Sequence, residues 1–138
     1  MSASLRPVVL AAVAASVLAF AASGVDTADT ELRIRVWPGG RGEGMSRTWT
    51  LACAPARGTL PRRDTACRRL AGVTRPFAPP PKDMQCTLIY GGPAEALVTG
   101  TYRGRKVWAL LTLRDGCQIS RWRRVAFLTP GYGASGKS

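Results

Sequence analysis

The sequence predicts an α+β domain, in which a single antiparallel sheet of about five strands packs against one or two short helices. Three observations indicate this class. Residues 31–37 alternate between apolar and charged side chains, which is typical of a strand with one buried face. Residues 94–102 and 105–113 form two more strand-like runs, separated by a two-residue turn. Residues 61–71 carry apolar side chains at helical spacing, so a helix is expected to cover one face of the sheet.

The N-terminal segment, residues 1–22, is expected to be a signal peptide. An arginine is followed by an uncharged apolar run that is too short and too rich in alanine to be a comfortable membrane span. The tripeptide Ala19-Phe20-Ala21 places small side chains at the spacing that signal peptidase requires. We therefore expect export with cleavage after Ala21, or alternatively after Ser23, and no membrane association after cleavage. An uncleaved membrane anchor is the other interpretation of this segment.

The domain itself is expected to span residues 31–128, after a flexible leader over residues 23–30. In its first strand the apolar side chains share one face and the two arginines share the other. A glycine-rich loop separates this strand from a second short strand, residues 48–52, in which Trp49 and Leu51 share one face.

Pro61 favours the start of a helix, because the first helical turn needs no N–H group at that position. Ala66, Cys67 and Leu70 then form one helical face, and Gly72 is expected to end the helix. The following segment, residues 73–83, contains four prolines and is expected to be an extended loop.

The second half of the domain is expected to hold a hairpin and two weaker elements. The hairpin strands flank Arg103-Gly104, which is a turn of the X-Gly kind. Residues 115–121 are expected to form a short helix, and residues 125–128 an edge strand. Residues 129–138 are polar and rich in glycine with nothing to bury, so a disordered tail is expected.

Residues 131–138 match the phosphate-loop pattern G-x-x-x-x-G-K-S letter for letter. A phosphate loop works because a buried strand precedes it and a helix follows, whose N-terminal amides hold the phosphates. Here Pro130 precedes the pattern, and an exported protein meets little nucleotide. Nucleotide binding is therefore not expected.

The four cysteines, Cys53, Cys67, Cys86 and Cys117, are expected to form two disulfides, because an even number in an exported chain is typical of disulfide bonding. They lack the close C-x-x-C pairs of a zinc site and the chain has no histidine, so no metal or other cofactor is expected. Four cysteines allow three pairings, and spacing alone does not choose among them. We favour the two sequential loops, 53–67 and 86–117.

The chain is strongly basic, with a formal charge of +12 from 20 lysines and arginines against 8 acids. A field of this sign attracts anionic cell walls, nucleic acids and acidic proteins alike. The arginine clusters lie on different expected elements, and no strand carries a series of aromatic residues beside them. No dedicated nucleic-acid site is therefore expected. The clusters are residues 62–63, 68–69, 103–106 and 121–124.

Catalysis by this chain is not expected. The sequence lacks histidine, which is the commonest general base in enzymes. The acids Asp64, Asp83, Glu95 and Asp115 are scattered, and the three aspartates each follow an arginine or lysine directly in the sequence. Solvated surface carboxylates are the expected state of all four.

The stretch Gln85–Gly92, QCTLIYGG, allows two interpretations. Leu88 and Ile89 are typical of a buried strand. They also suit a loop that is held in an extended shape and presented to a protease, with Cys86 as the covalent attachment beside the exposed bond. The pattern of this stretch alone does not separate the two.

Longer segments carry a family resemblance. Residues 50–72, TLACAPARGTLPRRDTACRRLAG, run from a strand through a cysteine, a Gly-Thr pair and a proline-started helix with a second cysteine. Residues 84–117, MQCTLIYGGPAEALVTGTYRGRKVWALLTLRDGC, supply a loop, a hairpin and a fourth cysteine, and VAFL follows at 125–128. In order and spacing these segments resemble the Streptomyces subtilisin inhibitor family of secreted protease inhibitors, over about residues 32–128.

The resemblance implies a five-stranded antiparallel sheet with two helices, usually in a homodimer that packs through the sheet. It implies the disulfides Cys53–Cys67 and Cys86–Cys117. It aligns the reactive bond with Leu88–Ile89, so that Leu88 occupies the primary specificity position. Cys86 and Thr87 precede Leu88 in the protease-binding segment, and Tyr90 follows Ile89.

Two differences from the family concern this loop. The family often has proline where Thr87 stands, and Asp-Pro where this chain has Gly91-Gly92. Because glycine is conformationally permissive, we expect the segment after the reactive bond to be looser here.

The sequence therefore predicts a secreted, extracellular, noncatalytic inhibitor of subtilisin-like serine proteases. Leu88 is apolar and unbranched at Cβ, which suits the pocket of a subtilisin-type or chymotrypsin-type enzyme and not that of trypsin. The alternative is a cationic secreted protein that binds cell-wall or nucleic-acid polyanions.

Overall fold

The structure is a computed structural model that describes Ser4 and residues 30–133. The predicted signal peptide, apart from Ser4, and the predicted leader up to residue 29 lie outside the described residues, as do residues 134–138. No helix among the described residues is long and apolar enough to cross a membrane.

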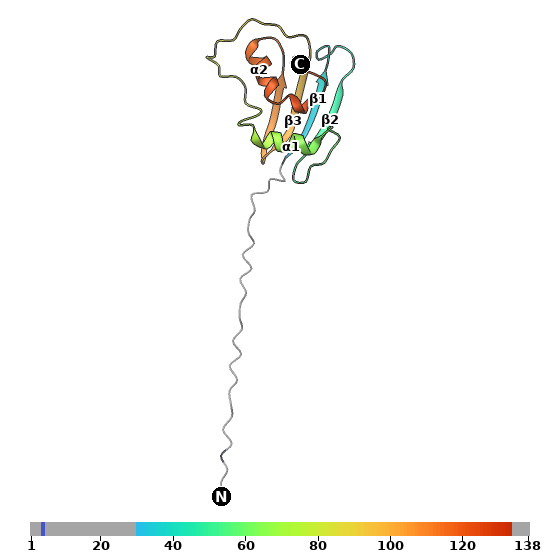
Figure 1. The fold of residues 1–138 in the computed structure, drawn as a ribbon, viewed down its shortest axis with the longest axis vertical. Helices are drawn as coiled ribbons and strands as arrows, with labels where there is room; N and C mark the ends of the chain where they lie inside the picture. Colours follow the sequence, from blue (N-terminus) through green and yellow to red (C-terminus); the bar gives the residue numbers. More distant parts are fainter. Residues whose placement is uncertain (1–3, 5–29, 134–138) are drawn as a thin grey trace.

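Four antiparallel strands form one open sheet with the order β2-β1-β3-β4 (Figure 1). The strands are β1 Glu31–Trp37, β2 Arg47–Ala52, β3 Glu95–Tyr102 and β4 Arg105–Leu111. Helices α1 Arg63–Gly72 and α2 Gly116–Arg124 cover one face of the sheet, and a 3-10 helix, Ala126–Leu128, follows α2. The predicted α+β class with helices on one antiparallel sheet is confirmed.

The core lies between the sheet and the two helices. In β1 the alternation is as predicted, because Leu32, Ile34 and Val36 are buried and the residues between them are exposed. Leu70 of α1 and Trp122 of α2 meet these strand residues in the same apolar cluster. The hydrophobic periodicity of the chain therefore determined which face of each element is buried.

The hairpin turn between β3 and β4 has the predicted chemistry. Arg103 and Gly104 both have positive φ, 48° and 75°, which is the backbone of the tight turn that joins two right-twisted strands. The strands pair without a gap up to this turn, from Ala96 opposite Leu111 to Tyr102 opposite Arg105.

The predicted edge strand at residues 125–128 is wrong, and the sheet in the described part of the chain has four strands instead of about five. Val125 and Leu128 are both fully buried, and the Leu128 amide donates to the Val125 carbonyl at 2.9 Å. Burial at a spacing of three suits a 3-10 turn, whereas a strand would have buried alternate residues.

The beginning of the predicted disordered tail is packed, contrary to the expectation. Thr129 is fully buried, and its hydroxyl accepts a hydrogen bond of 2.9 Å from the indole N–H of Trp122. The ring of Tyr132 lies 6.1 Å from that of Trp49, between ring centres. A buried tryptophan needs an acceptor for its N–H group, and the polar composition of the tail supplies one.

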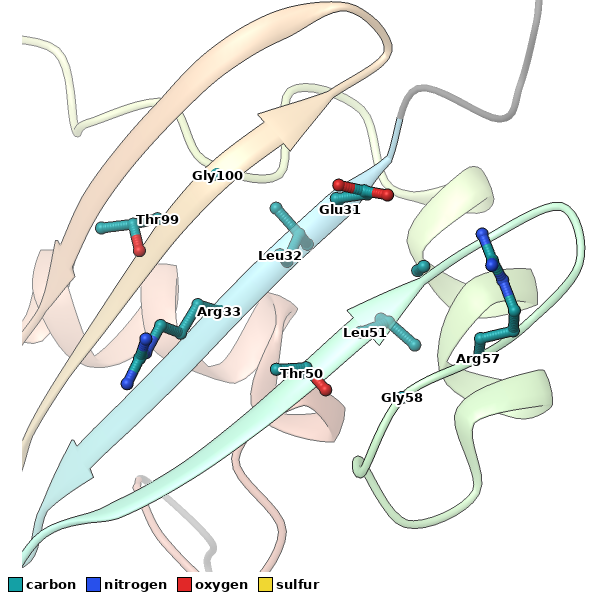
Figure 2. A pocket seen from close by; sticks show the side chains of 10 residues that line it. Glu31, Leu32, Arg33, Thr50, Leu51, Arg57, Gly58, Thr99 and Gly100 are labelled. Atoms are coloured by element: carbon teal, nitrogen blue, oxygen red, sulfur yellow. The ribbon is translucent and has the colours of Figure 1, made fainter.

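The face of the sheet away from the helices is open. Its strands present cross-strand rows of side chains, and one row runs from Thr50 through Arg33 and Thr99 to Trp108. Figure 2 shows the first three of these residues side by side, at a shallow depression of about 410 Å³. Trp108 is 68% exposed.

Candidate functional site

Among residues 30–133, one stretch holds most of the large apolar side chains that are exposed to solvent. Leu88 is 99% exposed, Tyr90 is 67% exposed and Ile89 is 59% exposed, and Met84 just before them is 51% exposed. These residues belong to no helix or strand. We call residues 84–92 the exposed loop. The interpretation of Leu88 and Ile89 as a buried strand is therefore wrong.

Two backbone hydrogen bonds hold the exposed loop on either side of Leu88-Ile89-Tyr90. Before them, the Thr87 carbonyl accepts a hydrogen bond of 2.9 Å from the Gly116 amide. After them, the Gly91 amide donates to the Leu113 carbonyl at 2.7 Å. Both partners lie in or beside the connection from β4 to α2, so one short segment of the scaffold fixes both ends of the protruding tripeptide.

The disulfides are Cys53–Cys67 and Cys86–Cys117, which confirms the favoured pairing. Cys86 lies in the exposed loop and Cys117 in the first turn of α2, with Cα atoms 5.3 Å apart. The bond closes a sequence separation of 31 residues. A cross-link of that length stabilises a fold by about 3–4 kcal/mol on the chain-entropy estimate, and here it also ties the loop to the helix.

Glycines allow the close contacts at both ends of the loop. A Cβ atom at Gly116 would overlap the Thr87 hydroxyl. A Cβ atom at Gly91 would lie 3.1 Å from Leu113 Cβ and from Ile119 Cδ1, which is tighter than normal packing. Gly91 itself is held in place, because its amide is hydrogen-bonded and its backbone lies against the Ile119 side chain of α2. The expectation that Gly91-Gly92 loosens the segment after the reactive bond stays a prediction. Gly92 has φ +118°, a conformation that other residues rarely adopt.

Asp115 begins α2 next to the loop. Its carboxylate accepts a hydrogen bond of 2.9 Å from the Gln118 amide and so caps the helix. Asp115 also lies near the sulfur atoms of Cys86 and Cys117. Because these two sulfurs are bonded to each other, they are not available as metal ligands.

The other candidate acids lie outside the exposed loop, and Asp83 directly precedes it. Glu95 forms an ion pair with Arg41, at 2.9 Å between Oε2 and Nε, and also accepts a hydrogen bond from the Arg41 amide. Partial burial acts to raise the pKa of Glu95, but these interactions with Arg41 outweigh it and lower the pKa below the usual value. Asp64 lies in the first turn of α1, and Asp83 is exposed in the loop before Met84.

Sequence reasoning missed two residues that hold the ends of the exposed loop, Leu113 and Gly116. Gly116 and Leu113 act through backbone groups, which leave little signal in a single sequence. The capping role of Asp115 could have been inferred, because an aspartate directly before an amphipathic helical pattern is a helix-start signal.

Comparison with known proteins gives a family and one similar structure. The model of the family described as "Subtilisin inhibitor-like" matches residues 28–112, which is more than half of the chain. This range includes the exposed loop and ends before Cys117. No curated protein matches the sequence.

A similar solved structure is that of Streptomyces caespitosus sermetstatin in complex with Bacillus licheniformis subtilisin. The two sequences are 25% identical, and the alignment covers 74% of this chain and 97% of that one, with a TM-score of 0.46. The extent of the family match establishes that this chain belongs to the subtilisin inhibitor-like family.

Proposed function

We propose that the protein is a noncatalytic inhibitor of subtilisin-like serine proteases, and that the enzyme binds it at Leu88–Ile89 as it would bind a substrate. Family membership supports the class of target. The observation that carries the proposal is the 99% exposure of Leu88 in a loop whose two ends are hydrogen-bonded to the scaffold. A protease pocket accepts one projecting side chain of its substrate, and the exposed Leu88 side chain is available to such a pocket.

The attachments of the loop account for inhibition instead of digestion. A loop that is already ordered binds without the entropy loss that a flexible substrate incurs. If the enzyme cuts Leu88–Ile89, the Cys86–Cys117 disulfide retains the new carboxyl end, and the hydrogen bond from Gly91 to Leu113 retains the new amine. The amine therefore stays beside the acyl group, and the bond can form again.

The side chain at position 88 sets the expected targets. Leucine fills a broad apolar pocket, as in subtilisin-type and chymotrypsin-type enzymes, and it offers no cation to the acidic pocket of trypsin. The net charge of +12 is expected to speed the encounter with acidic enzymes more than it adds to contact energy.

Titration against subtilisin, chymotrypsin and trypsin tests the proposal. We expect near-stoichiometric inhibition of subtilisin, weaker or equal inhibition of chymotrypsin, and none of trypsin. Raising NaCl from about 0.05 to 0.5 M should change the affinity little, whereas binding to a polyanion through phosphate contacts would weaken by orders of magnitude. Strong salt-sensitive binding to teichoic acid or DNA without any inhibition of subtilisin would favour the polyanion-binding alternative.

We also propose the domain organisation and localisation that the sequence predicts. Residues 1–22 act as a signal peptide, and the protein works outside the cell with the inhibitor domain starting near residue 31. Thr30 belongs to the domain, because it is buried and its carbonyl accepts a hydrogen bond of 3.1 Å from the Cys53 amide.

A homodimer through the open face of the sheet stays a prediction, and its strength is expected to depend on salt. Trp108 offers apolar area there, but Arg33 and Arg35 lie on the same face of the central strand β1. A two-fold packing of this face would bring like charges of two copies together, and salt would screen their repulsion.

Sedimentation velocity checks this prediction. The dimer fraction should rise between about 0.05 and 0.5 M NaCl, and Arg33→Gln should dimerise more strongly than the parent at low salt. Trp108→Glu should remain monomeric in both buffers. A dimer that weakens with salt, or one that Trp108→Glu leaves intact, would contradict this interface.

A further inference from the structure

Arg121 is a half-buried cation that no carboxylate of the described residues contacts. Its guanidinium donates three hydrogen bonds, all to backbone carbonyls: to Ala78 at 3.0 Å, to Leu110 at 2.8 Å and to Phe77 at 3.0 Å. Burial, and secondly the nearby charge of Arg124, lower the pKa of this guanidinium below its usual value. A charge held in this way needs an explanation, because burying an unpaired cation is costly.

The three carbonyls belong to two separate parts of the chain. Leu110 is in β4, an edge strand of the sheet. Phe77 and Ala78 are in the proline-rich segment, residues 73–83, which leads directly into the exposed loop. The prolines of this segment have no N–H group, so the segment has few hydrogen bonds of its own with which to attach to the sheet.

A groove separates the proline-rich segment from α2. It has a volume of about 940 Å³ and is lined on one side by Ala78 and Pro79–Pro81 and on the other by Ser120 and Arg121. Phe77 packs against the core, with its ring centre 5.5 Å from that of Tyr102, but the groove leaves residues 78–81 without apolar packing on the helix. Hydrogen bonds therefore attach the segment where this packing ends. Arg121 supplies two of them, to Phe77 and Ala78, and Arg124 adds one of 3.2 Å to the Arg75 carbonyl.

We propose that Arg121 is a positioning residue for protease inhibition, in that its guanidinium fixes the proline-rich segment to β4 and thereby orients Met84–Leu88 toward the enzyme. One helix then bears three attachments on this side of Leu88, because Arg121 follows Gly116 and Cys117 in α2. The inference rests on the proposed function, since it assigns a role within that same site.

A planar guanidinium can bond carbonyls of two chain segments at the same time, and a lysine ammonium is less suited to do so. Arg121 bonds carbonyls of two chain segments at once through Nε and both terminal nitrogens. A lysine ammonium is a single point charge, so Arg121→Lys keeps the charge but is expected to lose the simultaneous contact.

The test compares Arg121→Lys and Arg121→Met with Arg103→Met. Arg103 is a matched control, because its guanidinium also donates to a backbone carbonyl, that of Ala71, at the end of the sheet that carries α1. Two readouts are taken at a temperature where all variants are folded. One is amide hydrogen exchange at Met84 and Gly116, which donate to Pro81 and Thr87. The other is the rate at which a catalytic amount of subtilisin hydrolyses the Leu88–Ile89 bond.

We expect both amides to exchange roughly tenfold faster or more in Arg121→Met, with a smaller increase in Arg121→Lys and none in Arg103→Met. Hydrolysis of Leu88–Ile89 should accelerate in the same order. If Arg121→Met does not fold, Arg121→Lys decides alone.

Exchange and hydrolysis rates equal to the parent's in folded Arg121 variants would overturn the inference, even if their melting temperature fell. If the parent itself fails to inhibit subtilisin, the proposed function is overturned, and the exchange at Met84 and Gly116 still decides whether Arg121 orients this segment.

Discussion

Replacing Leu88 with lysine is expected to transfer inhibition from subtilisin and chymotrypsin to trypsin. Leu88 is almost wholly exposed and its side chain is not part of the core, so the change should leave the fold unaffected. A lysine would place its ammonium in trypsin's acidic pocket, whereas the desolvated charge would be unfavourable in an apolar pocket. Inhibition constants against the three enzymes measure the transfer.

Leu88→Gly gives the size of the effect. A side chain at the centre of an interface contributes about 2–4 kcal/mol when it is truncated, which corresponds to a loss of roughly 30- to 1,000-fold in affinity for subtilisin. Trp108→Gly is the matched control, since it removes another exposed apolar side chain on the open face of the sheet. If Leu88→Gly inhibits as well as the parent, the enzyme binds elsewhere.

Removing the Cys86–Cys117 disulfide is expected to turn the inhibitor into a substrate. In Cys86→Ala/Cys117→Ala the hydrogen bond between Thr87 and Gly116 is left to hold that end of the loop, and the new carboxyl end would drift from the amine after cleavage. Hydrolysis should then accelerate by at least about 100-fold, because the cut ends no longer meet at high effective concentration.

The other disulfide provides the control. Cys53→Ala/Cys67→Ala removes a bond of the same kind, between the end of β2 and α1, and should lower the melting temperature. It should nevertheless leave inhibition intact in the folded protein, because neither cysteine contacts the exposed loop in the structure. Equal acceleration of hydrolysis in both double variants would mean that global stability, and not the local attachment, prevents digestion.

The parts of the fold that the sequence predicted correctly are those with a local signal. The alternation in β1 fixed its buried face, and Arg103-Gly104 fixed the hairpin, because a turn with two positive φ angles favours glycine at its second position. The helix α1 was placed to within two residues of its observed start by Pro61 and by the spacing of Ala66 and Leu70.

The end of the domain was predicted poorly, because its structure depends on partners far away in the chain. Val125 has a high propensity for strands and Leu128 has no strong preference, so local propensity did not predict a 3-10 helix. Both side chains are buried, at a spacing of three, because they pack in the core. Thr129 was assigned to a disordered tail, although its hydroxyl is the acceptor that the buried Trp122 requires.

The candidate site was predicted in part. The local pattern left open whether Leu88 is buried, and the family resemblance pointed to an exposed position. The residues that hold the loop could not be predicted from the sequence. Gly91 and Leu113 meet through backbone groups, and Arg121 donates hydrogen bonds to carbonyls about 43 residues earlier in the chain. Such contacts exist only once the sheet has placed α2 beside the proline-rich segment.

Mapping the first bond that subtilisin cuts tests the central claim most directly. The protein is incubated with a catalytic amount of subtilisin, and the products are analysed by mass spectrometry before and after reduction. We predict one slow cut, at Leu88–Ile89, with the two pieces joined through Cys86–Cys117 until reduction and with intact inhibitor forming again from the cut form. A first cut at another bond, or rapid digestion of the whole domain, would contradict the account.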